Sequence, residues 1–248
     1  MLDSLLWIEL CIVLFSGFVH GVLGFGFPMI ATPLFALVVD LKKAILYTLF
    51  PTIFTNVWSL KRDNTFSAIW RDFKLLILGI LAGSFVSTNL LIVYNSPYYK
   101  LILVGVILVY LTKLHERLSI SYFVKHYRLM TLFIMGVMSG FIGGIANIMV
   151  PVLIMLILEL KLEKKHSIGV MNLCFIANKS LQVVMFGMHG NFDMDSGLLI
   201  ALFVVISLIG FKFGVIIHDK IDDELYKKVL NYVLWVLSIY LLISTFFM

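Results

Sequence analysis

The sequence predicts an all-α polytopic membrane protein made of two homologous, inverted repeats, each a broken helical hairpin followed by three transmembrane helices. The first observation is composition. Of 248 residues, 61% are hydrophobic and 13% charged, whereas soluble domains are about 45–50% apolar and about 25% charged. The second is the set of apolar stretches, which run over 5–39, 44–60, 74–94, 98–114, 129–158, 167–188, 196–217 and 228–247. Since roughly 20 apolar residues cross a bilayer, these stretches exclude a soluble enzyme, a disordered chain and a collagen-like chain.

The charged residues lie mainly in the short connections between these stretches. The 19 Lys and Arg against 14 Asp and Glu give a net charge of +5, which is typical of cytoplasmic loops and does not indicate nucleic-acid binding. Cys11 and Cys174 lie far apart and form neither a redox pair nor a metal site. The N-terminus lacks a basic region, so we expect the first apolar stretch to be retained and not cleaved as a signal.

Short motifs recur in the second half of the chain at offsets of 118 to 131 residues. The third observation is therefore a duplication, with the first repeat at 1–114, a cytoplasmic connection at 115–126 and the second repeat at 127–248. The matched pairs are Ser16-Gly17-Phe18 with Ser139-Gly140-Phe141, Pro33 with Pro151, Asn56 with Asn178, Gly79-x-x-x-Gly83 with Gly210-x-x-x-Gly214, and Tyr99-Lys100 with Tyr226-Lys227.

The first segment of each repeat, 5–39 and 129–158, is too long for one span and too short for two spans with a turn. Glycine permits positive φ and proline lacks a helical donor, and both segments contain several of these residues. We therefore expect two part-helices in each segment, with the two breaks meeting near the bilayer midplane. Two full tilted spans, or one long tilted helix, are the alternatives.

Loop charge predicts the orientation, because Lys and Arg collect on the cytoplasmic side. Basic residues on both sides of 129–158 place both ends of that segment inside, and the acidic loop 189–195 lies outside. The opposite orientation of the first repeat places 61–74 inside and 95–97 outside. Lys42 and Lys43 are then outside, against the rule. Three crossings after each hairpin make the repeats inverted.

The glycine-rich run Ser16-Gly-Phe-x-x-Gly-x-x-Gly-x-Gly with Pro33, its repeat over 139–151, and the Gly-x-x-x-Gly motifs resemble the sulfite exporter TauE/SafE family over nearly the whole chain. The resemblance implies a multi-pass permease of the bacterial inner membrane for small anions, often sulfur oxyanions, sulfonates or related organic acids. Two departures prevent us from carrying over the substrate. The first run ends in Gly24-Phe25-Gly26-Phe27-Pro28 where many members have three glycines, and the second keeps few glycines after Gly144.

The helix breaks are candidate anion sites, because an interrupted helix presents unpaired N–H groups and a positive dipole end. The alternative is that glycine there allows tight helix crossing. The residues expected to take part are Gly24, Gly26, Gly144 and Asn147.

Polar side chains within apolar stretches are the other candidates for substrate binding. Asn56, Asn178 and Gln182 either bind the anion or hydrogen-bond between helices, and His20 is either a proton relay or an ordinary hydrogen-bonded histidine. Lys179 is the full charge near the middle of a span, without an intramembrane carboxylate in the other central spans. We interpret it as a cavity-facing ammonium that awaits an anion; the alternative is a structural lysine satisfied by carbonyls or held neutral.

The predicted function is secondary transport of a small anion, which the breaks and Lys179 hold at the midplane. No G-x-x-x-x-G-K-[ST] motif is present, so we expect no ATP hydrolysis by this chain. A passive anion channel is the alternative, and a membrane-embedded enzyme is a weaker one, since no H-E-x-x-H, G-x-S-x-G or C-x-x-C motif occurs. We expect no cofactor, no metal and no nucleic-acid partner. A coupling proton or sodium ion, and a homodimer, are compatible with the sequence.

Overall fold

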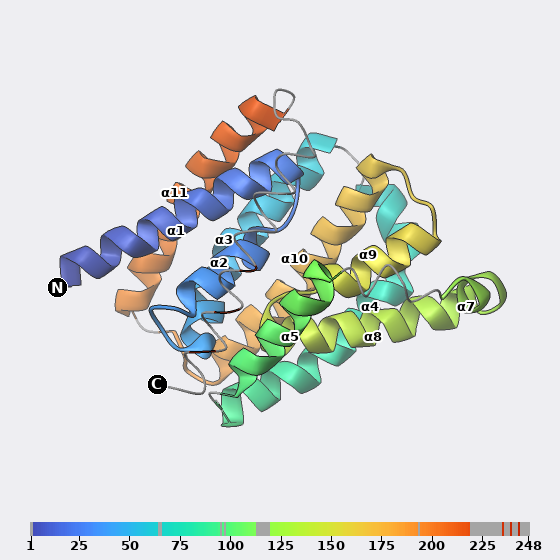
Figure 1. The fold of residues 1–248 in the computed structure, drawn as a ribbon, viewed down its shortest axis with the longest axis horizontal. Helices are drawn as coiled ribbons and strands as arrows, with labels where there is room; N and C mark the ends of the chain where they lie inside the picture. Colours follow the sequence, from blue (N-terminus) through green and yellow to red (C-terminus); the bar gives the residue numbers. More distant parts are fainter. Residues whose placement is uncertain are drawn as a thin grey trace.

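The computed structural model describes residues 2–63, 66–94, 96, 98–112, 120–192, 194–218, 235, 239 and 243. In this part of the chain every regular element is a helix. Figure 1 shows them as a bundle of long helices into which shorter helices are packed. Their bounds are α1 Leu2–Leu23, α2 Phe27–Phe35, α3 Leu41–Asp63, α4 Phe66–Tyr94, α5 Tyr99–Leu111, α7 Ser121–His126, α8 Arg128–Ala146, α9 Val150–Glu159, α10 Lys164–Met188 and α11 Met194–His218.

Five of these helices, α1, α4, α8, α10 and α11, are long and apolar enough to cross a membrane. The all-helical, multi-pass membrane architecture is therefore confirmed. The predicted last span, 228–247, lies outside the described residues except at three positions. The division into two repeats stays a prediction, as do the boundaries of its three regions.

Both first segments are interrupted, as the sequence predicts. α1 ends before Gly24, which has a φ of 81°, and α8 ends before Asn147, which has a φ of 62°. A residue in this left-handed region is a common way to end a helix. The next helix begins three residues later in both cases, with Pro28 or Pro151 in its first two positions, where proline sacrifices no helical hydrogen bond. We call residues 24–26 the first break and residues 147–149 the second break.

The two arms of each hairpin differ in length, which partly corrects the expectation of two part-helices. α2 has 9 residues and α9 has 10, so each is about 14–15 Å long. α1 and α8 have 22 and 19 residues and are themselves candidate spans. Each hairpin is thus a long helix followed by a short returning helix.

The closest helix packing crosses between the two halves of the chain. α8 packs along α4, and α1 packs along α11, and these are the most extensive helix contacts in the described structure (Figure 1). Glycine permits this approach, because a Cβ on Gly83 would collide with the backbone of Val137, and a Cβ on Gly210 with the backbone of Leu14. Such small-residue contacts are typical of membrane helices.

These contacts change two of the matched pairs. The position equivalent to Pro151 is that of Pro28, because both begin the short helix, and Pro33 lies inside α2. Gly210 corresponds to Gly83, because both meet the other half at equivalent points.

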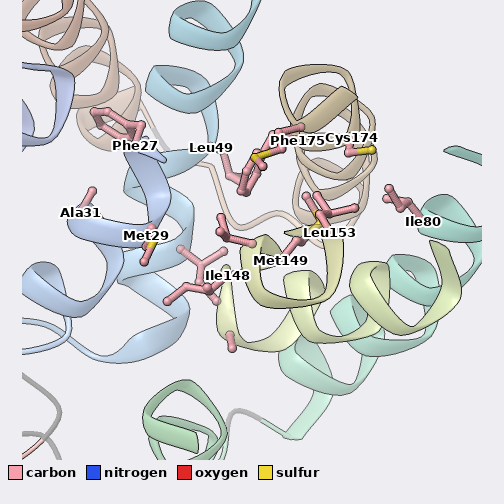
Figure 2. Packing of buried hydrophobic residues seen from close by; sticks show 14 of the residues in the cluster. Phe27, Met29, Ala31, Leu49, Ile80, Ile148, Met149, Leu153, Cys174 and Phe175 are labelled. Carbon is pink, nitrogen blue, oxygen red and sulfur yellow. The ribbon is translucent and has the colours of Figure 1, made fainter. Parts of the chain in front are cut away.

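The apolar core lies between the two hairpins. Figure 2 shows Phe27 and Met29 from α2, Leu49 from α3, Met149 from the second break and Phe175 from α10 around one interior, and all are buried. α3 and α10 lie at the centre, where α10 also contacts α4 and α3 also contacts α11. The two central helices therefore carry most of the polar residues that reach the breaks.

Candidate functional site

The first break is held by side chains from both central helices. The carbonyl oxygen of Gly24 accepts a hydrogen bond of 3.1 Å from the Ser59 hydroxyl on α3 and one of 3.0 Å from the Asn172 amide on α10. A helix end leaves carbonyl groups without partners, and these two donors satisfy one of them. The left-handed turn at Gly24 therefore depends on α3 and α10 together.

His20 lies one turn before the first break and is fully buried. Its Nδ1 accepts a hydrogen bond of 3.3 Å from the backbone N–H of Phe27, the first residue of α2. The Phe211 ring of α11 lies edge-on, with the two ring centroids 5.5 Å apart. The other ring nitrogen, Nε2, is buried and has no hydrogen-bond partner among the described residues.

The second break is tied to the first half of the chain. The Asn147 side-chain amide donates hydrogen bonds to the hydroxyl groups of Thr32, at 2.6 Å, and Thr48, at 2.7 Å. Thr32 belongs to α2 and Thr48 to α3. Asparagine tolerates the left-handed conformation better than most residues, so one side chain both ends α8 and joins the hairpins.

Lys179 is connected through Gln182 to the last turn of α8, three residues before the second break. The Lys179 ammonium donates to the Gln182 side-chain oxygen, and the Gln182 amide donates to the carbonyl oxygen of Gly144 at 3.1 Å. Both side chains are fully buried. No carboxylate in the described part of the chain pairs with Lys179.

Four buried asparagine side chains have an oxygen without a hydrogen-bond partner in the described part of the molecule. Asn178 donates its amide to the Ser84 hydroxyl of α4 at 2.5 Å, and Asn56 donates its amide to the Thr52 carbonyl at 2.6 Å. An unpaired buried polar atom costs about 1–3 kcal/mol, so these oxygens are unusual in a closed interior. The four oxygens are Oδ1 of Asn56, Asn147, Asn172 and Asn178.

The two breaks lie at different depths, so the prediction that they meet is wrong. Along α3, Ser59 contacts the first break and Thr48 contacts the second. Eleven residues of helix separate them, which is about 16 Å at 1.5 Å per residue. Along α10, Asn172 contacts the first break, and Gln182 contacts Gly144, three residues before the second break. This order is opposite to that on α3, so α3 and α10 run antiparallel. Each long hairpin arm passes the middle of the bundle before the chain turns.

The glycine candidates differ in what surrounds them. Gly26 has a φ of 99°, and a Cβ placed there would meet no described atom within 4 Å. Gly144 lies inside α8, not at the break, and a Cβ there would collide with the Ser87 hydroxyl of α4. Gly144 is therefore needed for close packing on α4, and it offers the site its carbonyl oxygen.

Several partners of the candidate residues did not emerge from the sequence: Thr32, Thr48, Ser59 and Ser84. Hydroxyl residues are common in membrane helices, where they bond the preceding turn. One signal was present, because Thr48, Thr52 and Asn56 follow one another every fourth residue. This spacing places them on one face of α3.

The described residues contain no group of three or more His, Cys, Asp or Glu side chains that could hold a metal ion. Cys11 is exposed and Cys174 buried, and both are free thiols.

Comparison with known proteins agrees with the motifs. A family model described as sulfite exporter TauE/SafE matches residues 10–241 of this chain. No curated protein and no solved structure matches it. The family match covers nearly the whole chain and includes both breaks and both central helices, so the chain belongs to the sulfite exporter TauE/SafE family of membrane permeases.

Proposed function

We propose that this protein is a secondary transporter that moves a small anion across the bacterial inner membrane. The substrate class is a sulfur oxyanion, a sulfonate or a related organic acid. Membership of a permease family supports the transport function, and five candidate spans support the membrane location. The chain carries no P-loop motif, so an ion or substrate gradient must supply the energy.

The observation that carries the anion proposal is Lys179. A charged side chain within a bilayer costs several kcal/mol unless it is paired or faces water. Lys179 is fully buried, and its partner is the neutral amide of Gln182. A small anion would balance the charge that no described carboxylate balances.

The position of Lys179 suits a binding site between two ends of a pathway. On α10 it lies between Asn172, which reaches the first break, and Gln182, which reaches the last turn of α8 before the second. On α3, Asn56 likewise lies between Thr48 and Ser59. We propose that the anion binds between these levels, near Lys179, Asn178 and Asn56, and that the two breaks yield in turn to open the site to either side.

A proton or a sodium ion would couple this movement to a gradient, and a homodimer is compatible with the proposal. The competing function is a passive anion channel, since the same buried charge would attract an anion in a pore. Concentrative uptake distinguishes the two, because a channel only equilibrates its substrate.

The test begins with thermal-shift measurements on the purified protein with sulfite, thiosulfate, sulfonates and carboxylates. An anion that raises the melting temperature is then used for counterflow in proteoliposomes, where a transporter accumulates labelled anion transiently against its gradient. Stabilisation by none of these anions would refute the substrate class, and simple equilibration without counterflow would favour the channel.

A further inference from the structure

His20 joins the end of one helix to the start of the next at the first break. Its ring is fully buried, and its Nδ1 accepts from the Phe27 N–H at 3.3 Å. A neutral imidazole has one donor nitrogen and one acceptor nitrogen. Because Nδ1 is the acceptor, the neutral ring carries its hydrogen on Nε2, and this buried N–H has no acceptor among the residues that the structure describes.

We infer that His20 is the proton-binding group of this transporter and that its protonation releases the first turn of α2. The inference rests on the proposed function and adds the coupling ion to it. A proton taken from water would add to Nδ1, after which both ring nitrogens are donors. The Phe27 N–H would then face another N–H, so the bond that holds α2 to α1 would be lost. A positive charge beside the start of α2 also opposes the helix dipole.

α2 has no titratable residue. α3 carries one acidic residue, Asp63, which ends the helix one turn after Ser59. Arg62, a cation, lies three residues after Ser59 on the same helix. Lys61 is exposed at the end of α3.

The other charged groups near this region belong to α11, α10 and α1. Lys212 of α11 lies 5.7 Å from the centroid of the Trp58 ring, and His218 ends the helix. Lys164 and its two basic neighbours are exposed at the start of α10. Lys179, also basic, lies seven residues after Asn172, about 10 Å along the helix. Glu9 of α1 is eleven residues from His20, about 16 Å along the helix. The Nε2–H of a charged His20 has no acceptor among the described residues, so a transported anion that accepted from it would favour the protonated ring. Proton binding and anion binding would then favour the same open state. Each ligand would raise the affinity of the protein for the other by the same factor.

The first test measures the release of α2 without transport. Met29, in the first turn of α2, is 2% exposed, and the substitution Met29→Cys is made in a Cys11→Ser, Cys174→Ser background. The rate at which a methanethiosulfonate reagent labels the introduced thiol at position 29 is compared at about pH 8 and about pH 5, the range in which histidine titrates. The same measurement on His20→Gln corrects for the pH dependence of the reagent, since an amide oxygen can accept from Phe27 but cannot take the proton.

With His20 present, we expect acidification to raise labelling about tenfold relative to His20→Gln, the effect of about 1.4 kcal/mol. His189→Gln is the matched control, because His189 is exposed at the end of α10, and it should behave like the protein with both histidines. An equal pH response with and without His20 would overturn the inference.

The second test uses sulfite in proteoliposomes. A proton gradient should drive sulfite accumulation by the unmodified protein, whereas His20→Gln should lose this accumulation. Gradient-driven accumulation by His20→Gln at the unmodified rate would also overturn the inference. If the unmodified protein moves no sulfite, the proposed function fails for this anion, and the labelling result still decides the role of His20.

Discussion

Lys179 is a fully buried amine whose described partner is an amide group. Replacing it with methionine keeps most of the side-chain length and removes the charge, so the protein without anion should be at least as stable as before. Anion binding should weaken tenfold or more, which corresponds to about 1.4 kcal/mol or more. Thermal unfolding with and without the anion chosen by screening measures both effects.

Two further variants give this experiment its controls. Lys179→Arg keeps the charge but changes its shape, so weak binding with altered selectivity is expected. Lys212→Met removes an exposed lysine on α11 and should leave anion binding unchanged. Normal transport by Lys179→Met would show that Lys179 does not bind the substrate, and it would refute the proposal of an anionic substrate that depends on this residue.

Asn147 combines a left-handed backbone with two buried hydrogen bonds. Asn147→Ala should lose both bonds, at about 1 kcal/mol each, and add about 1–2 kcal/mol of left-handed strain. Asn147→Gly should lose the bonds without the strain and therefore destabilise less. Denaturation of both variants in the same detergent measures the difference. Equal stability of the two would show that the backbone at this position does not govern the second break.

At the scale of helices and breaks, Gly26 and Gly144 should respond differently to the same change. Gly26→Val adds left-handed strain at a position with open space around the Cβ, so we expect insertion and folding with a loss of transport. Gly144→Val would push the side chain into Ser87 and should reduce the yield of folded protein, because α8 could no longer lie against α4. Size-exclusion profiles and counterflow separate the two outcomes. A Gly26→Val variant that transports normally would show that the first break need not keep this backbone conformation.

The breaks were predictable from the sequence, whereas their depth was not. Glycine with positive φ and proline at a helix start are local signals, and Gly24, Pro28 and Pro151 carry them in the sequence itself. Depth depends on which part of α3 each break contacts. Those contacts are made by Ser59 and Thr48, which are among the commonest polar residues in membrane helices and carry no distinguishing pattern alone.

The candidate site shows the same limit. Lys179 and Gln182 were predictable together, because they lie about one turn apart on one helix. The hydrogen bond from Gln182 to Gly144 joins residues 38 positions apart. It depends on the tertiary packing of α10 beside the end of α8, which the local sequence does not specify. Asn178 and Asn56 were matched by position in the chain, yet one bonds α4 and the other its own helix. A sequence repeat therefore does not ensure equal roles.

For the whole molecule, the distribution of Lys and Arg conflicted with an inverted arrangement only at Lys42 and Lys43. The structure explains the first of these, because Lys42 Nζ donates to the carbonyl oxygen of Ile92 at 3.5 Å, near the end of α4. A cation beside carbonyl groups at a helix C-terminus is favourable. Lys43 lies over the Tyr47 ring, 5.8 Å from its centroid. Both lysines therefore have local partners that would stabilise them on either side of the membrane.

This arrangement predicts that the connections before α3 and before α10 lie on opposite sides of the membrane. Asp40 and Glu163 are exposed in these connections, and α3, with 23 residues, separates its two ends by about 34 Å. Single cysteines at positions 40, 163 and 71, in a background without Cys11 and Cys174, are labelled with an impermeant maleimide from either side of the membrane. Arg71→Cys and Glu163→Cys should be labelled from the cytoplasm, because positive loops are retained there, and Asp40→Cys from the outside. If positions 40 and 163 react from the same side, the inverted arrangement is wrong, and the two halves of the chain would have to share one orientation.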